Sequence, residues 1–185
     1  ELGYFAPDKV GRLQFTSLKN QLPFGERNLT DVWELEVVNN DVFFRTNSKL
    51  LKLNSEKFTV YPAPSNWISL HKHQGRILAQ DEKTGLMVYV NGGWQSFIQK
   101  EVLPAGFIIT DIKAFKKDTS LLSTTRHGLY LLVQNKLLPF SFSNAGFNTL
   151  QHITALLVLK DSSFLIGTYF NGIYHLGQQG QVQEN

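Results

Sequence analysis

Three short stretches decide the fold: TGLMVYV at residues 84–90, HGLYLL at 127–132 and NGIYHL at 171–176. In each stretch a glycine is followed by a run of apolar residues typical of a β-strand. Gly85, Gly128 and Gly172 lie 43 and 44 residues apart along the chain. A repeat of this length is typical of a four-stranded propeller blade, so the spacing predicts a β-propeller.

The residues around each stretch complete the blade. A short strand precedes each glycine, and a turn signal and another apolar strand precede that one; these pairs are 67–71 with 76–80, 109–115 with 121–125, and 153–159 with 164–168. A fourth strand follows at 94–97 and at 136–140. A less regular copy spans 31–61, with Ser48-Lys49 where the others have Gly. Residues 3–5 and 11–15 have the pattern of the last two strands of an earlier blade.

The predicted fold is therefore all-β, a β-propeller fragment of about four four-stranded antiparallel blades plus half a blade. Residues 1–185 form one partial propeller domain. We expect a half blade over 1–18 and blades over 30–62, 66–98, 108–141 and 152–185. Because the first blade lacks its first half, we expect an arc cut from a larger ring. Such an arc closes tightly, pairs with a second copy of the chain or has disordered ends.

Composition narrows the function classes. The 185 residues hold 18 Lys+Arg against 15 Asp+Glu, and a net charge of +3 is too small to predict contact with nucleic acid. Cys is absent, which excludes disulfides, zinc–thiolate sites and a Cys nucleophile. The longest aliphatic run, 155–159, is far below the roughly 18 residues of a membrane span, so we expect a soluble domain without membrane insertion. Since the chain begins at Glu1 and its one Met is Met87, we expect a processed or excised piece.

Two motifs resemble a known family. FLIGTYFNGIY, residues 164–174, is similar to the two-component regulator propeller repeat. The opening, from Gly3-Tyr4-Phe5 to Asp31-Val32-Trp33, resembles the propeller sensors of Bacteroidetes-type bacteria that also carry a triple-tyrosine domain. Departures are Asn171 for the first Gly of the usual pair, Ala79-Gln80 for Gly-Thr, and no Gly before Leu50.

The resemblance implies a periplasmic or other extracytoplasmic sensing domain. In such a protein the propeller is followed by the triple-tyrosine domain, one membrane helix and a histidine kinase or helix-turn-helix output. The implied ligand is a small molecule or oligosaccharide whose binding changes how two sensor copies pack, which makes a homodimer a candidate partner, and no cofactor is expected. A rigid protein-interaction scaffold, which would expose one broad apolar patch, is the first alternative. A propeller glycosidase or lyase is the second.

Propeller geometry brings certain loops to one face, where ligands usually bind. These are the loops between second and third strands, 46–48, 81–84, 125–127 and 169–171, and the connectors 16–30, 62–66, 98–107 and 141–152. The candidate ligand-binding residues on them are Asp81, Glu82, Lys83, Arg126, His127, Tyr169, Phe170 and Asn171. Tyr169 and Phe170 either stack on a sugar or other flat ligand, or fold over a neighbouring blade. The charged loop tips either meet a ligand or are simply solvated.

Other noticeable residues are expected to have structural roles. His71 and His73 share one side of a strand at a spacing that suits a metal, but no third ligand is evident and we expect a solvated turn. Trp33, Trp67 and Trp94 are expected to fill the wedges between blades. The sequence lacks hydrolase, metalloprotease and phosphate-loop motifs. Of the carboxylates Asp81, Glu82, Asp111, Asp118 and Asp161, Asp118 and Asp161 belong to turns on the opposite face, so we expect a non-catalytic domain.

Overall fold

The computed structural model describes residues 2–55, 57–142 and 152–183. Within these ranges its regular structure consists of β-strands and three short 3-10 helices, and the strands form consecutive antiparallel sheets. The all-β prediction, with four-stranded antiparallel sheets, is confirmed. None of the helices in the described ranges is long and apolar enough to cross a membrane.

The chain begins with a hairpin of two strands, β1 (Gly3–Pro7) and β2 (Leu13–Ser17), followed by η1 (Lys19–Gln21) and η2 (Phe24–Glu26). The next sheet contains β3 (Glu34–Val38), β4 (Asp41–Arg45), β5 (Lys49–Asn54) and β6 (Lys57–Pro62). It is followed by β7 (Trp67–His73), β8 (Arg76–Asp81), β9 (Gly85–Val90) and β10 (Gly93–Gln99), and by η3 (Lys100–Val102).

Two sheets complete the chain. One contains β11 (Ile109–Lys116), β12 (Thr119–Thr124), β13 (Leu129–Val133) and β14 (Lys136–Pro139). The last has three named strands, β15 (Ile153–Val158), β16 (Phe164–Thr168) and β17 (Gly172–Leu176). After β17 the chain turns back, and a single bridge pairs Val182 with Leu176. This bridge lies where the other sheets have their fourth strand.

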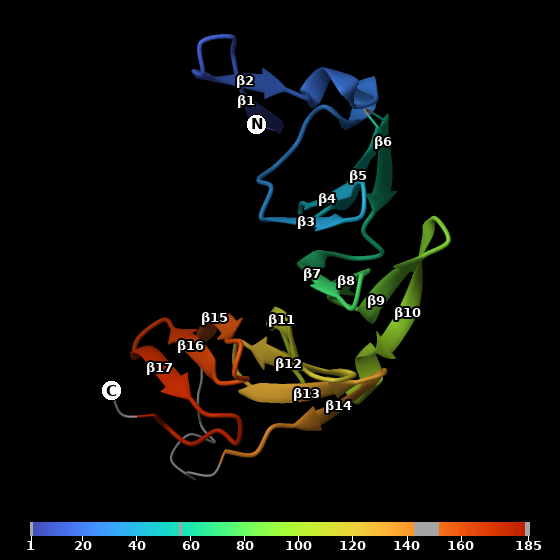
Figure 1. Cartoon of the computed structure of the whole chain (residues 1–185). Helices are drawn as coiled ribbons and strands as arrows, with labels where there is room; N and C mark the ends of the chain where they lie inside the picture. The colour runs from blue at the N-terminus through green and yellow to red at the C-terminus, as the bar shows by residue number, and fades with distance from the viewer. Residues whose placement is uncertain (1, 56, 143–151, 184–185) are drawn as a thin grey trace.

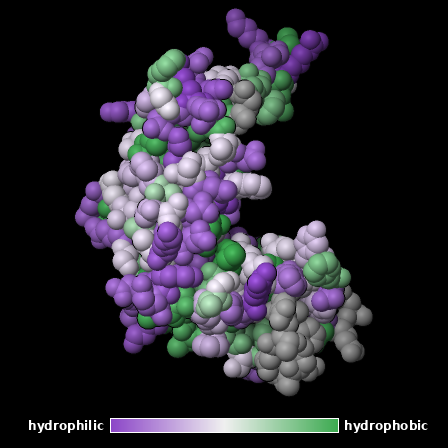
Figure 2. Space-filling view, turned by 180° about the vertical axis from the view of Figure 1, so that it is seen from behind, coloured by the Kyte–Doolittle hydropathy of each residue, from purple (hydrophilic) through white to green (hydrophobic). Residues whose placement is uncertain are grey.

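The sheets follow one another around an open crescent (Figure 1). The first strands of successive sheets are neighbours: β7 contacts both β3 and β11, and β11 contacts β15. The two chain ends lie at the two tips of the crescent, and the view from behind shows the same open outline with a largely hydrophilic surface (Figure 2). This is the arrangement of consecutive blades in an incomplete propeller.

The repeated glycine has a local cause at Gly85, which starts the third strand of its sheet. Its φ of +93° is unfavourable for other residues, and an added Cβ would lie 2.5 Å from the Ile98 carbonyl oxygen. Gly128 and Gly172 also have positive φ, 71° and 76°. The motif that decided the fold therefore reflects a backbone requirement at the start of the third strand.

Apolar side chains fill the wedges between adjacent sheets. The wedge between β7–β10 and β11–β14 is formed by Leu78, Leu86, Val88, Ile98, Leu103, Phe107, Ile109, Ile112, Leu122 and Leu132. The preceding wedge is aromatic, with Trp67 packed against Trp94 and Phe43 against Tyr89. Because both faces of a middle strand contact neighbouring sheets, five of the six residues of β8 are buried.

Two sequence predictions are wrong. Trp33 does not fill a wedge: it lies just before β3 and is 60% exposed, whereas Trp67 is buried as expected. His71 and His73 are not in a solvated turn: both are buried on β7. The Nδ1 atom of His73 lies 3.0 Å from the Ser120 hydroxyl of the next sheet, so this imidazole belongs to the contact between sheets.

Candidate functional site

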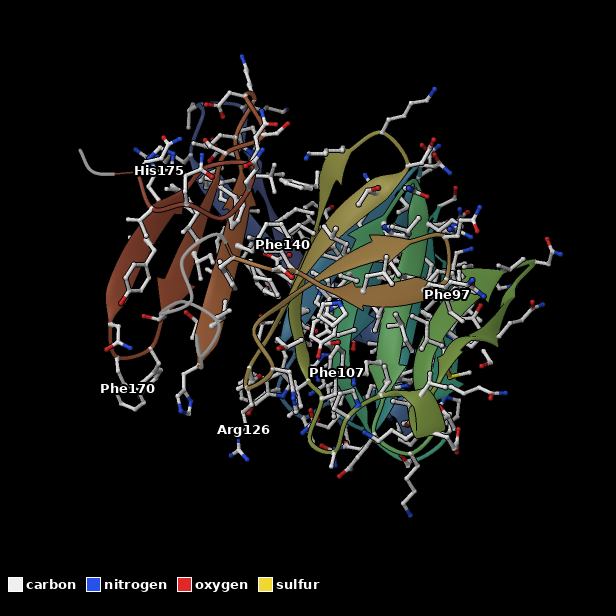
Figure 3. All side chains as sticks on the ribbon, turned by 90° about the horizontal axis from the view of Figure 1, so that it is seen from below. Phe97, Phe107, Arg126, Phe140, Phe170 and His175 are labelled. Atoms are coloured by element: carbon white, nitrogen blue, oxygen red, sulfur yellow. The ribbon has the colours of Figure 1, made fainter. Side chains whose placement is uncertain are left out.

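The predicted loop face exists as one end of the sheets. The β8–β9, β12–β13 and β16–β17 loops leave their sheets at corresponding positions. Seen from below, Arg126 and Phe170 lie at the same end of their sheets, while His175 lies at the far end of β17 (Figure 3). Connector 98–107 also reaches the loop face, because its last residues enter β11 there. Most of connector 141–152 lies outside the described residues.

A pocket of about 410 Å³ lies on this face, between the β8–β9 loop and the connector that leads into β11. It is lined by Ile68, Glu82, Lys83, Lys100, Gly106, Phe107 and Ile108. Glu82 and Lys83 are two of the predicted site residues. A volume of this size falls within the range of small-molecule sites in proteins.

Asp81 holds the β8–β9 loop in place and is itself buried. Its carboxylate accepts hydrogen bonds from the backbone N–H groups of Ser65, Asn66, Lys83 and Thr84, at 2.8–3.1 Å, and from the hydroxyls of Ser65 and Thr84. Burial alone would raise the pKa of Asp81, but these amide hydrogen bonds outweigh it and lower the pKa below its usual value. Asp81 thus positions Glu82 and Lys83 and is not available to a ligand.

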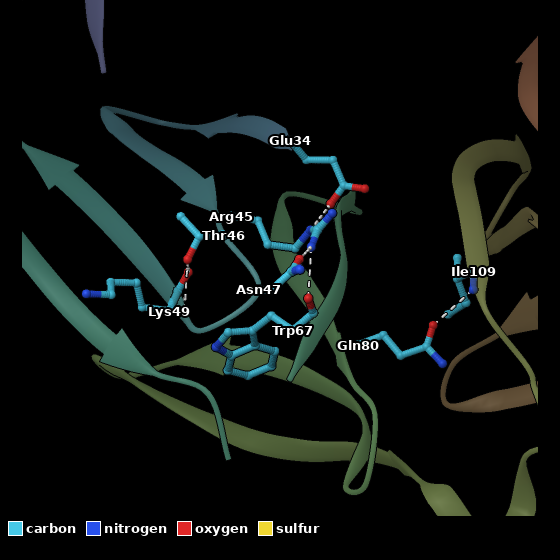
Figure 4. Close-up of polar contacts among 8 residues, drawn as sticks. All are labelled: Glu34, Arg45, Thr46, Asn47, Lys49, Trp67, Gln80 and Ile109. Carbon is cyan, nitrogen blue, oxygen red and sulfur yellow. Dashed lines mark hydrogen bonds and ion pairs between the residues drawn. The ribbon is translucent and has the colours of Figure 1, made fainter. Parts of the chain in front are cut away.

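Gln80 joins the two sheets behind the pocket. Its side-chain Nε2 donates to the Phe107 carbonyl at 2.7 Å, and its Oε1 accepts from the Ile109 N–H at 2.9 Å. The amide therefore satisfies two backbone groups at the entry to the next sheet, and Figure 4 shows the bond to Ile109. These two hydrogen bonds fix Phe107 and Ile109, and Phe107 forms part of the pocket wall.

The preceding junction uses a different residue for the same purpose. Buried Arg45 donates to the Trp67 carbonyl at 2.8 Å and to Asn47, and its Nε lies 2.5 Å from the Glu34 carboxylate (Figure 4). At the following junction the His152 N–H donates directly to the Thr125 carbonyl. Each junction is closed by hydrogen bonds to the backbone at the start of the next sheet.

His127 supports the pocket from behind. Its ring stacks on Phe107, with centroids 5.7 Å apart, and its Nε2 lies 3.0 Å from the Ala105 carbonyl oxygen. Tyr130 packs edge-on against the same Phe107 ring at 5.1 Å. The predicted site residue His127 is therefore a positioning residue for the connector rather than part of the pocket lining.

The remaining predicted residues lie on the same face but outside the pocket. Arg126 is exposed and forms no hydrogen bond or ion pair with any described residue. Tyr169 and Phe170 are 74% and 71% exposed, and their rings pack edge to face at 4.8 Å. Phe170 also packs on His152 at 5.3 Å, so the pair forms a small aromatic platform at the β16–β17 loop, and Asn171 is exposed beside it.

Three of the carboxylates considered for catalysis lie in turns or in an ion pair. The described ranges contain no group of three or more His, Asp or Glu side chains arranged to hold a metal ion. The Asp161 carboxylate accepts hydrogen bonds from the backbone and hydroxyl of Ser163, which makes it a turn residue. Asp118 has a φ of 57° in the β11–β12 turn. Asp111 pairs with Lys113 at 2.8 Å.

Sequence reasoning identified the β8–β9 loop and connector 98–107 but missed Lys100, Ile108 and Ile68 as pocket residues. Their positions within the loops and strand starts of this face were the available signal. The connector residues that face the β8–β9 loop are set by η3, a 3-10 helix that the sequence pattern did not predict.

No family model matches the chain, and neither does any curated protein sequence. Solved structures do match. The extracellular domain of BT3049, assigned to a hybrid two-component system of B. thetaiotaomicron, aligns over 89% of this chain with a TM-score of 0.64 and 15% identity, and the match covers 22% of that domain.

Two further solved structures also match the chain. The extracellular domain of BT4673, assigned to a hybrid two-component system of the same organism, aligns over 99% of this chain with a TM-score of 0.51 and 14% identity, and the match covers 33% of that domain. The WD40 β-propeller domain of Doa1 aligns over 78% of this chain with a TM-score of 0.52 and 14% identity, and the match covers 50% of that domain. The chain thus has the fold of a propeller segment, and its structural neighbours include extracellular domains of two-component systems, the class of protein that the sequence motifs resemble.

Proposed function

We propose that this chain is part of the extracytoplasmic ligand-sensing propeller of a membrane-bound signalling or transcription regulator, and that it does not catalyse a reaction. The observation that carries the proposal is the pocket on the loop face, which combines exposed charged groups from the β8–β9 loop with apolar side chains from the connector. The structural likeness to extracellular domains of two-component systems supports the same role. An extracytoplasmic, periplasmic location follows from this role and is part of the proposal.

The position of the pocket between two sheets suits sensing. Asp81 fixes one wall and Gln80 fixes the other, and the two walls belong to different sheets. A ligand that touches both walls stabilises one relative position of the two sheets. Such a ligand shifts the balance between conformations by its differential affinity for them, which is what a sensor requires.

A thermal-shift screen tests this proposal. The purified chain is heated with neutral and acidic oligosaccharides and small metabolites, and a true ligand stabilises it by about 2.7 kcal/mol at a hundredfold excess over its dissociation constant. Two double variants locate the site: Lys83→Ala with Ile108→Ala in the pocket, and Tyr169→Ala with Phe170→Ala on the aromatic platform. We expect the first variant to abolish the shift. A shift lost only in the second would move the site to the platform, and the absence of any hit with a folded chain would contradict sensing by this segment.

One observation favours a second candidate function, a protein-interaction scaffold. The β1–β2 hairpin exposes large apolar side chains, Tyr4, Phe5, Val10, Leu13 and Phe15. Exposed apolar patches of this kind mark interaction surfaces. If the hairpin mediates association, size-exclusion chromatography with light scattering shows an oligomer that a Phe5→Ser, Leu13→Ser variant dissociates. A monomer at all concentrations would contradict self-association through this hairpin.

A further inference from the structure

The pocket's side chains indicate the chemistry of its ligand. Lys83 and Lys100 contribute two ammonium groups and Glu82 one carboxylate. None of these three side chains forms a hydrogen bond or ion pair within the described ranges, although the adjacent Asp81 carboxylate is fully hydrogen-bonded. The pocket is therefore net positive, and its charged groups are free to meet a ligand.

The apolar side of the pocket is small and firmly held. Phe107 is itself fully buried, so the apolar surface that a ligand would touch comes from Ile68 and from Ile108, which is 39% exposed. Behind them, the Phe107 ring is packed between His127 and Tyr130. This wall offers an aliphatic surface on which the flat C–H face of a ring can lie.

We infer that the pocket binds a ring compound that carries both a carboxylate and hydroxyl groups, the chemistry of a uronic acid. This inference rests on the proposed sensing function and gives its ligand class. The ligand carboxylate accepts charge-assisted hydrogen bonds from Lys83 and Lys100, which are stronger than those between neutral groups. The face of the ring packs on Ile68 and Ile108.

Glu82 makes the pocket selective for this class of ligand over other anions. Its carboxylate repels an anion that offers no donor, but it accepts hydrogen bonds from ring hydroxyls. An aromatic acid such as benzoate satisfies the lysines and leaves Glu82 without a donor, whereas neutral glucose satisfies Glu82 and leaves the lysines without an anion. A uronic acid satisfies all three groups.

An NMR titration of the ¹⁵N-labelled chain tests the inference, with glucuronate, glucose and benzoate as probes. Glucuronate is expected to shift the amides of residues 82–84, 100 and 106–108, and to bind about tenfold or more tightly than glucose, since a hydrogen bond to a charged group contributes about 1.5 kcal/mol or more. Benzoate is expected to bind more weakly than glucuronate. Raising the ionic strength weakens glucuronate binding, because the lysines are exposed to screening by salt.

Matched variants complete the test. The Lys83→Gln, Lys100→Gln variant is expected to weaken glucuronate binding about tenfold or more and to leave glucose binding unchanged. Lys9→Gln, which removes a lysine from the turn of the β1–β2 hairpin, changes neither. Folding of each variant is read from the remaining amide signals.

The outcomes separate the inference from the proposed function. Equal binding of glucose and glucuronate in the pocket would overturn the need for an anion and leave the sensing proposal standing. Equal binding of benzoate would overturn the need for hydroxyls. If none of the probes shifts the pocket amides, the ligand class is wrong, while a hit elsewhere in the thermal-shift screen would still support sensing.

Discussion

Replacing Gln80 with Leu should loosen the junction between the second and third four-stranded sheets. The side chain is fully buried, and its amide satisfies the Phe107 carbonyl and the Ile109 N–H at 2.7 and 2.9 Å. Leucine has a similar size but no polar atom. The variant therefore leaves two buried backbone groups without partners in a place that water does not reach.

The magnitude follows from those two groups. Each buried polar group without a partner costs about 1–3 kcal/mol. Burial of the leucine side chain offsets about 1–2 kcal/mol of that loss. We expect a net loss of about 3 kcal/mol in the free energy of unfolding, which in a chain of this length lowers the melting temperature by about 6–12 °C.

Urea unfolding followed by tryptophan fluorescence measures this loss where it occurs, since Trp67 and Trp94 belong to the sheet that carries Gln80. Far-ultraviolet circular dichroism follows the whole chain in parallel. Gln95→Leu is the matched control: Gln95 is exposed on β10, so its replacement should change stability by no more than about 0.5 kcal/mol. A Gln80→Leu variant within about 1 kcal/mol of the parent chain would refute the role of this amide at the junction.

Three further predictions concern groups with different burial. Burial, with a smaller effect of the Lys113 charge, lowers the pKa of His71 to about 3. Because the unfolded chain then binds a proton that the folded chain does not, the free energy of unfolding should fall by about 2 kcal/mol between pH 6.5 and pH 5. A His71→Leu variant should lose this pH dependence in urea titrations. The pKa of Asp81 is lowered in the folded state, so the ionised carboxylate stabilises the fold above about pH 4, and this stabilisation is lost as the pH falls through the folded-state pKa. Asp81→Asn should lower the free energy of unfolding by about 2–4 kcal/mol at pH 7, and its stability should depend less on pH in the acid range. Because Tyr169 and Phe170 are mostly exposed, their double replacement by Ala should change the melting temperature by less than about 3 °C, and a larger shift would show that the platform is covered in solution.

The repeat could be predicted from the sequence because its structural cause is local. Gly85 has a positive φ beside the Ile98 carbonyl, and Gly128 and Gly172 share the positive φ at the corresponding position of their own sheets. The strands and turns follow from alternating apolar residues and turn formers only a few positions apart. Features of this kind do not depend on what the neighbouring sheet contributes.

Burial of side chains between neighbouring sheets could not be predicted from the sequence in the same way. A middle strand such as β8 is buried on both faces, so alternation of polar and apolar residues no longer distinguishes inside from outside. His71 and His73 looked solvated because the partner of His73, Ser120, is 47 residues away in the sequence. Trp33 was expected to be buried because it falls within a predicted strand, but β3 begins one residue later and the side chain is 60% exposed.

The junction chemistry also explains why the sequence predicted only part of the lining of this pocket. Glu82 and Lys83 lie in a loop that recurs in every repeat, so propeller geometry placed them on the loop face. Lys100 and Ile108 lie in a connector whose length and helix differ from those of the other connectors. Their position opposite the β8–β9 loop follows from Gln80, whose amide fixes Phe107 relative to β8.

For a ligand bound as proposed, the pocket and the junction are thermodynamically coupled. A ligand that contacts Lys83 on one sheet and Ile108 on the other adds its binding free energy to the contact that Gln80 already makes between those sheets. By linkage, the ligand binds the open junction more weakly by the same factor by which it favours the closed junction, so its affinity falls in a variant that populates the open junction. A ligand that contacted only one sheet would bind the Gln80→Leu variant as tightly as the parent chain. Ligand affinity in this variant thus distinguishes a pocket that reports on the relative position of two blades from one that only holds its ligand.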